Sequence, residues 1–313
     1  MQRIQVTYDL RADRTGDVML QQLVVRLAAR ALQDGREQTA ERMLAQLGLT
    51  KDRVRELQQL PLETLIAAQG ASGGGFGPYV DGKVIPTHPF DPAAPAISAD
   101  IPVIVGSNLH DSGFQNPNFA LDEAGLRERA KTMFAEGAEK VVAAYRAADP
   151  RATPFKLLAR INTDRGTRRD AITLAERKAA PGRAPAYLYL LTYESVPFGG
   201  KFGSVHGTEM PFFYHNLDAW PIAGTGPAAQ ALADRMAGTY LAFAKTGTPT
   251  VPGIGEWPAY TADRRATMVF DASSSVENAP HQDLLELVSS YPVAAPAPRG
   301  QASESQATAG GEE

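Results

Sequence analysis

The chain has 313 residues, of which 43% are hydrophobic and 21% are charged, and its formal net charge is −4. This balance is typical of a globular protein with a large core, and it argues against a nucleic-acid or acidic-membrane partner. The sequence contains no cysteine, which excludes a disulfide framework and a thiolate metal site and slightly favours a reducing, cytoplasmic location.

The sequence gives three further expectations, about metals, membrane spans and secretion. The five histidines form no His-x-x-x-His pattern and no His-Glu pair at ligand spacing, so we expect neither a zinc enzyme nor a metal cofactor. No apolar run approaches the roughly 20 residues that span a bilayer. Residues 1–5 do not begin a hydrophobic secretory segment, although Met1 need not be the natural start of the protein.

The first predicted elements are helices. Residues 17–34 carry apolar side chains at helical spacing, and residues 37–47 form a second helical pattern. Residues 51–60 and 61–68 predict two short helices. The glycine-rich residues 70–75 then predict a flexible break.

Three apolar runs predict strands. Residues 101–106 form a continuous apolar run, typical of a parallel strand that is covered on both faces. Two more strands are predicted at 187–193 and 266–271. Helical patterns lie between and beside them, at residues 122–135, 138–148, 164–180 and 227–246. Strands that alternate with helices predict an α/β fold with a sheet flanked by helices.

The composition changes close to the end of the chain. Residues 294–313 consist mainly of small and polar residues, with few apolar side chains to bury. Such a segment predicts a disordered tail. The folded domain is therefore expected within residues 1–293.

Two polar loops follow the first two predicted strands, at residues 107–113 and 203–213. Active sites of α/β folds lie at the carboxyl ends of the strands, so these loops are the candidate site. Asp111 in the first loop and His206 in the second match the end of the order Ser…Asp/Glu…His, in which an acid orients an imidazole that moves protons. Two structural alternatives stay open: Asp111 as a turn or cap residue, and His206 as a hydrogen-bonded structural histidine.

Five segments occur in one order along the chain: Phe76–Gly82 (FGPYVDG), Ile101–Gly113 (IPVIVGSNLHDSG), Gly203–Phe213 (GSVHGTEMPFF), Leu232–Tyr260 and Ala266–Asp271. In that order they resemble the type-B carboxylesterases, the para-nitrobenzyl esterase and cholinesterase-like group of α/β-hydrolases. The resemblance covers most of residues 20–290 and corresponds to the C-terminal half of a family member. It implies an α/β-hydrolase sheet without its N-terminal half, a small-molecule carboxylic ester as substrate, and no cofactor or metal.

The resemblance also assigns roles to residues. The family's catalytic histidine falls on His206 and its catalytic acid on Asp111, where most members carry glutamate. An alternative register would put Ser112 at the acid position. Glu209 matches an acidic residue near the family's histidine, either as a group that tunes the imidazole or, the favoured interpretation, as a structural hydrogen-bonding group.

We expect structural roles for the aromatic and histidine residues that lie near the two candidate residues. Phe212 and Phe213 are expected in the core rather than in a substrate pocket. His110 and His215 have no assigned role, and both are expected at the surface.

The nucleophile of such an esterase is not found in its expected context. The family's serine stands in a Gly-x-Ser-x-Gly elbow between a strand and a helix. Residues 70–74 satisfy that pattern with Ser72 at its centre, but a predicted helix precedes it and a strand follows. No HGGG-type oxyanion loop occurs before residue 20. We therefore expect a part of an ester hydrolase that has no measurable esterase activity by itself.

Two alternative functions stay open. The chain could be a non-catalytic esterase-like binding module, or one chain of a two-chain esterase whose serine comes from a separate polypeptide. A half-sheet also leaves an unpaired edge at the strand near residue 103, which would pair with the missing half or self-associate.

Overall fold

The computed structural model of the chain describes residues 37–72, 80, 82–114, 117–194 and 196–292. The described residues divide into two compact units, one that ends at His88 and one that begins at Pro89. Each unit has its own hydrophobic core. The predicted helix at 17–34 and the predicted tail from residue 294 lie outside the described residues, as does most of the segment at 76–82.

The unit that ends at His88 is helical. It contains α2 (Glu37–Gln46), the 3₁₀ helix η1 (Lys51–Gln59) and α3 (Leu62–Ala71). Met43 and Leu44 of α2 pack with Leu57 of η1 and Leu65 of α3 in one buried cluster. The helices predicted at 37–47 and 61–68 are confirmed, whereas the segment predicted as a helix at 51–60 is the tighter 3₁₀ form.

The unit that begins at Pro89 is built on a four-stranded sheet with the strand order β1-β2-β3-β4. Its strands are β1 (Val103–Asn108), β2 (Ala186–Leu191), β3 (Ala266–Phe270) and β4 (Ser275–Asn278). The first three are parallel and confirm the strands predicted from apolar runs, while β4 runs antiparallel to β3. The sequence did not predict β4, because most of its side chains are exposed and form no apolar run.

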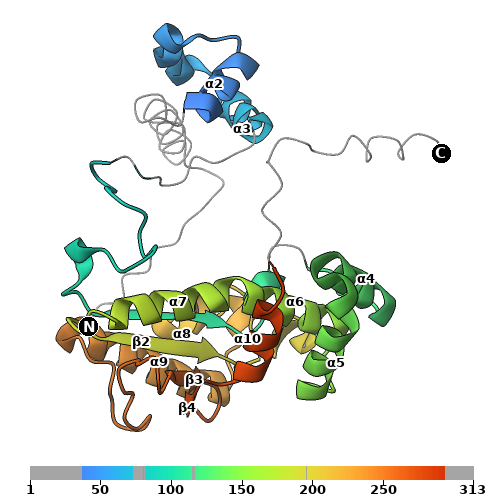
Figure 1. Ribbon diagram of the computed structural model, residues 1–313, viewed down its shortest axis with the longest axis vertical. Helices are drawn as coiled ribbons and strands as arrows, with labels where there is room; N and C mark the ends of the chain where they lie inside the picture. Colours follow the sequence, from blue (N-terminus) through green and yellow to red (C-terminus); the bar gives the residue numbers. More distant parts are fainter. Residues whose placement is uncertain (1–36, 73–79, 81, 115–116, 195, 293–313) are drawn as a thin grey trace. The chain divides into compact units, whose positions relative to one another are not determined.

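Helices cover both faces of this sheet (Figure 1). Successive side chains of a strand point to opposite faces. Leu188 of β2 accordingly packs with residues of α7 (Thr167–Ala179), and Tyr187 and Leu191 pack with residues of α9 (Pro227–Thr246). The predicted α/β architecture, a sheet between two helical layers, is therefore confirmed.

A further group of helices lies at one end of the sheet (Figure 1). It comprises α4 (Glu123–Phe134), α5 (Ala138–Ala148), α6 (Pro154–Arg165) and α10 (Gln282–Ser289), which share one apolar cluster. The helix predicted at 164–180 corresponds to α7, and α6 before it was not predicted. The side chain of Thr153 caps α6 by accepting the backbone N–H of Lys156, and Gly166 separates α6 from α7.

Short helical segments complete this unit. They are η2 (Ala96–Ser98), η3 (Asp111–Gly113), η4 (Ala135–Gly137), η5 (Pro197–Gly200), α8 (Met210–Phe213), η6 (Leu217–Ala219) and η7 (Pro221–Ala223). Phe212 of α8 is fully buried, and Phe213 packs against the same cluster. Both phenylalanines therefore belong to the core, as predicted.

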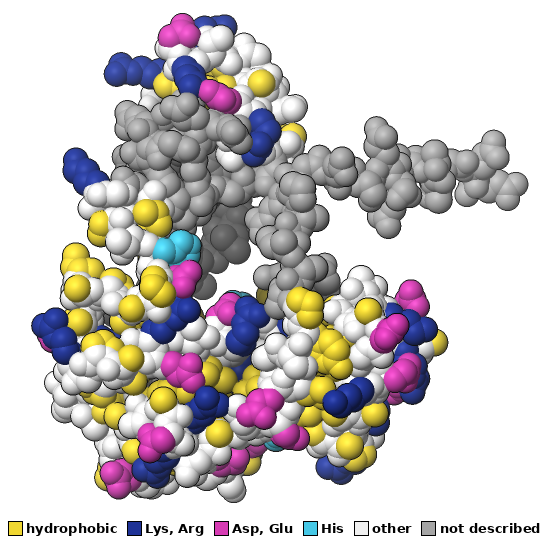
Figure 2. All heavy atoms as spheres, viewed as in Figure 1, with side chains coloured by type: hydrophobic (Ala, Val, Ile, Leu, Met, Phe, Trp, Pro, Cys, Tyr) yellow, Lys and Arg dark blue, Asp and Glu magenta, His cyan; other side chains and the backbone are white. Residues whose placement is uncertain are grey.

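Among the described strands, β1 forms one edge of the sheet and pairs only with β2. The first four residues of β1 are only partly buried, whereas β3 is buried throughout. Two isoleucines shortly before β1, Ile97 and Ile101, are 85% and 63% exposed. Hydrophobic side chains are also visible between charges of both signs on the drawn surface (Figure 2). The described sheet thus has the open edge that was predicted near residue 103.

Candidate active site

Two loops that follow neighbouring strands are joined by hydrogen bonds at the carboxyl end of the sheet. The backbone N–H of His110 donates to Ser204 O at 2.8 Å, and the backbone N–H of His206 donates to Asp111 O at 3.3 Å. Leu191 O at the end of β2 accepts from the backbone N–H of Leu109 and from Ser204 Oγ. These bonds fix the loop after β1 against the loop that carries His206.

His206 and Asp111 are in direct contact. His206 Nδ1 lies 2.7 Å from Asp111 Oδ1. An ionised carboxylate can only accept a hydrogen bond, so when the imidazole is neutral its proton is on Nδ1 and Nε2 presents a lone pair. The histidine side chain is 66% exposed and the aspartate side chain 6%. The acid is therefore held inside the protein, while the imidazole remains open to a reacting group.

The surroundings of Asp111 act on its carboxyl group in opposite directions. Burial raises the pKa of Asp111 above its usual value, and the hydrogen bond and charge of His206 oppose that rise. The charge of Glu209 adds to it. The ionised carboxylate is thus maintained against burial by the histidine it orients.

Asn108, the last residue of β1, is hydrogen-bonded to the loop that carries His206. Its Nδ2 donates to Val205 O at 2.7 Å and also to a carboxylate oxygen of Glu209. Glu209 is half-buried. It therefore takes the structural hydrogen-bonding part favoured from the sequence, and its charge acts on Asp111 as well.

Ser112 and Ser72 occupy positions that match neither the acid nor the nucleophile. The backbone N–H of Ser112 donates to Thr163 Oγ1 at 3.0 Å, and it is Asp111 that contacts His206. Ser72 caps the end of α3, where its hydroxyl donates to Gln69 O at 2.7 Å and its side chain is buried. The helix predicted before Ser72 is confirmed, so the strand-before-serine context of an elbow is not met.

The structure corrects the surface position predicted for His110, because this side chain is only 1% exposed. Its Nδ1 accepts the backbone N–H of Ser204 at 3.1 Å. His215 lies at the surface as predicted, where its Nε2 is 2.6 Å from Asp234 Oδ1. The signal in the sequence that points to burial of His110 is its position four residues after the predicted strand at 101–106, in one of the two polar loops expected at the carboxyl ends of the strands.

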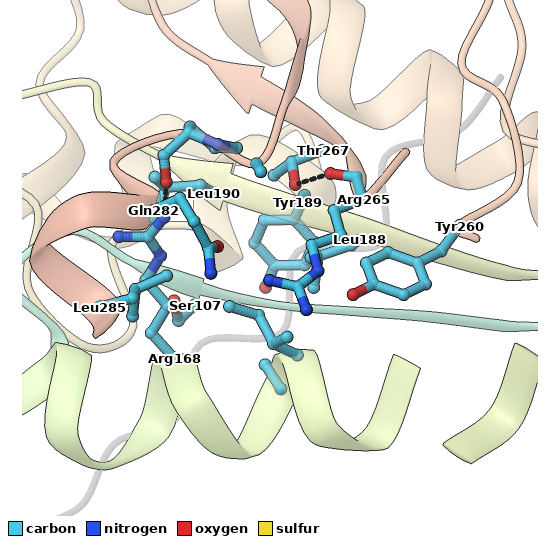
Figure 3. A pocket seen from close by; sticks show the side chains of 14 residues that line it. Ser107, Arg168, Leu188, Tyr189, Leu190, Tyr260, Arg265, Thr267, Gln282 and Leu285 are labelled. Carbon is cyan, nitrogen blue, oxygen red and sulfur yellow. Dashed lines mark hydrogen bonds between the residues drawn. The ribbon is translucent and has the colours of Figure 1, made fainter. Parts of the chain in front are cut away.

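A small cavity lies between α7, the sheet and α10 (Figure 3). Its volume is about 20 Å³, and Ser107, Arg168, Tyr260 and Arg265 are among the residues that line it. That volume holds about one water molecule, so this cavity cannot take an ester substrate. Ser107 Oγ has no protein partner among the described residues, and a bound water would satisfy it.

The described residues contain neither a metal-binding cluster nor a membrane-spanning helix. His, Asp and Glu side chains nowhere gather there in a group of three or more that could hold a metal ion. Within that same part of the chain, every helix is too short or too polar to cross a bilayer.

The sequence matches the model of the carboxylesterase family over residues 24–287. Phenmedipham hydrolase from Pseudarthrobacter oxydans is 28% identical over a 255-residue alignment that covers 74% of this chain and 50% of that protein. Para-nitrobenzyl esterase from Bacillus subtilis (strain 168) is 27% identical over a 217-residue alignment that covers 66% of this chain and 42% of that protein.

Solved structures of esterases have the same fold. The Geobacillus stearothermophilus carboxylesterase EST55 superposes with a TM-score of 0.63 at 30% identity, covering 80% of this chain and 53% of the esterase. An esterase from Clostridium hathewayi superposes with a TM-score of 0.60 at 25% identity, covering 82% of this chain and 52% of that one. The chain thus spans about half the length of the relatives it matches.

Proposed function

The chain belongs to the carboxylesterase family, and on that premise we propose that it carries the acid and the base of a serine-type carboxylic ester hydrolase. Its substrate is a small-molecule carboxylic ester. The observation that supports this most strongly is the 2.7 Å contact between His206 Nδ1 and Asp111 Oδ1, with the carboxylate buried and the imidazole open. The hydrolase and esterase activities that two relatives carry in their names support the same reaction class.

In the proposed reaction His206 moves the protons and Asp111 holds the imidazole. Nε2 of His206 takes the hydroxyl proton of a serine as the serine Oγ bonds to the ester carbonyl carbon. Asp111 accepts the Nδ1–H and stabilises the imidazolium. Nε2 then gives the proton to the leaving alcohol as the ester C–O bond breaks, which leaves the acyl group on the serine.

Hydrolysis of this acyl group uses the same base a second time. His206 takes a proton from a water molecule, whose oxygen bonds to the acyl carbon. The bond between that carbon and the serine Oγ then breaks, the serine regains its proton from Nε2, and the carboxylic acid is released. Each cycle returns His206 and Asp111 to their starting forms.

We further propose that a polypeptide segment outside these 313 residues supplies the serine and the oxyanion donors. Two observations support this: the chain spans about half the length of its relatives, and the hydroxyl of Ser72 is buried at a helix end. The open edge of β1 is the docking place we propose for that segment, because an unpaired strand offers its backbone groups to another strand.

The test expresses the chain with and without the sequence encoded immediately upstream of it and measures hydrolysis of p-nitrophenyl acetate. We expect turnover only in the assembled protein, and we expect the upstream sequence to carry a Gly-x-Ser-x-Gly elbow. His206→Ala should lower the kcat of the assembled protein by a factor on the order of 10⁴ to 10⁶. His215→Ala is the matched control, because that histidine lies at the surface and pairs with Asp234.

Three outcomes would contradict the proposal in different ways. Turnover by the chain alone that disappears in His206→Ala would place the nucleophile within these residues. Turnover of the assembled protein that survives His206→Ala would remove the role of the base. An upstream sequence without an elbow would favour a binding module.

A further inference from the structure

His110 makes a two-way hydrogen-bonded pair with the backbone of Ser204. The backbone N–H of His110 donates to Ser204 O at 2.8 Å, and the backbone N–H of Ser204 donates to Nδ1 of the His110 ring at 3.1 Å. Ser204 stands two residues before His206, and His110 stands directly before Asp111. The pair therefore joins the two loops right beside the proposed acid and base.

The backbone at Gly203 is shaped to receive the His110 ring. Gly203 has a φ of +70°, and a Cβ at this position would lie 2.6 Å from His110 Nδ1. Only glycine meets both requirements, because it tolerates positive φ and has no Cβ to collide with the ring. The ring is thus packed against the histidine loop as well as bonded to it.

The environment of His110 keeps its acceptor nitrogen free of a proton. Burial, together with the nearby charges of Lys156 and Arg160, lowers the pKa of His110 to about 3. A neutral imidazole has one donor and one acceptor nitrogen, and the bond from Ser204 identifies Nδ1 as the acceptor. The bond therefore persists over the whole pH range in which a carboxylate can pair with a histidine.

From this geometry we propose that His110 is a positioning residue for His206: its ring fixes the Gly203–Ser204 backbone and thereby holds the His206 imidazole against Asp111. The catalytic meaning of this role rests on the function proposed above. The positioning itself is a property of the folded chain. Without the acceptor at His110, the buried N–H of Ser204 has no partner and the loop gains freedom.

The test compares two substitutions at this position in the full chain. His110→Asn keeps an acceptor near the place of Nδ1, whereas His110→Leu keeps an apolar volume without an acceptor. Two signals are followed by NMR: the amide exchange rate of Ser204 and the downfield resonance of the proton between His206 Nδ1 and Asp111. We expect His110→Leu to speed the exchange by about 10-fold or more and to broaden or abolish the downfield resonance. We expect His110→Asn to restore both.

Both signals are independent of turnover, so they can be read even if the proposed hydrolase activity is not found. Unchanged amide exchange in β3 shows that the variants are folded. If His110→Leu does not fold, Gly203→Ala disturbs the same pair from the other loop and should give the same two changes. Exchange and resonance that stay as in the parent chain in His110→Leu, or that are not restored by His110→Asn, would overturn the proposal. In the assembled enzyme, His110→Leu should lower kcat and leave KM unchanged.

Discussion

At the scale of single residues, the burial of Asp111 links the stability of the fold to the protonation state that the proposed reaction needs. Burial raises the pKa of Asp111, so the folded state holds the carboxyl proton to a higher pH than the unfolded state does. This group contributes stability fully below its unfolded pKa, near 4. The contribution is lost as the pH rises through the folded pKa. An ionised Asp111 thus lowers the stability of the fold in the pH range in which the proposed reaction needs it.

Asp111→Asn separates these two effects. The neutral amide keeps the shape of the side chain and removes the titration, so its free energy of unfolding relative to the parent chain should rise as the pH increases from 4 to 7. In the assembled enzyme, the same change should lower kcat by about 10⁴-fold. Urea unfolding at several pH values measures the first effect. A stability difference that is constant with pH, or that falls, would contradict this account.

At the scale of elements, two glycines differ in how they tolerate substitution. The close approach of β1 to β2 requires glycine at position 106, whereas Gly238 inside a helix can be replaced by alanine. Gly106 of β1 is paired with Tyr189 of β2. A Cβ at Gly106 would lie 2.4 Å from both Tyr189 Cδ1 and Tyr189 O, and the backbone oxygen cannot move aside cheaply. Gly238 lies inside α9, where a Cβ would meet nothing within 4 Å.

These two glycines make a matched pair of substitutions. Gly106→Ala should destabilise the fold by about 1–3 kcal/mol, because it forces the edge strand β1 away from β2. Gly238→Ala should stabilise it by about 0.5–1 kcal/mol, because alanine loses less backbone entropy in a helix. Chemical denaturation of both variants gives the two values. Equal effects of the same sign would show that the strand contact does not limit this position.

The sequence predicted those elements that carry a continuous or periodic pattern of apolar residues. The three parallel strands and α9 have continuous or periodic apolar patterns, and each lies within a few residues of its predicted range. The apolar pattern did not predict α6, because the buried face of this helix includes the polar residues Arg160, Thr163 and Asp164. Such polar residues look like loop or surface positions until their tertiary partners are known.

The candidate site was predicted in the same uneven way. Asp111 and His206 followed from their places after neighbouring strands and from family resemblance, and the structure places them in contact. The supports around them, His110 and Asn108, were not predicted. Their partners are backbone groups of a loop almost one hundred positions away, and no local pattern encodes such a pairing.

At the scale of the whole molecule, we expect the open edge of β1 to determine how the isolated chain associates in solution. A partly buried edge strand with exposed isoleucines beside it favours pairing between copies when no other partner is present. We expect the isolated chain to self-associate in a concentration-dependent manner in sedimentation velocity experiments. Ile101→Lys should weaken this association, since a lysine near an edge strand opposes pairing.

The control for this prediction is Ile66→Lys. Ile66 is also exposed, but it lies on α3 in the unit that ends at His88. It should leave the association unchanged if the edge is responsible. A strictly monomeric parent chain at all concentrations would refute the prediction, and equal effects of the two lysines would point to general hydrophobicity.

The bonds that hold His206 to Asp111 all arise within the unit that begins at Pro89. The proposed acid and base are therefore preassembled in this one unit, and in the proposed enzyme the serine and the oxyanion donors arrive from elsewhere. Hydrolysis would then report complementation: titrating one fragment with the other would give a saturation curve whose midpoint measures their affinity. In a divided esterase of this kind, the rate of hydrolysis would therefore measure how much of the two parts has associated.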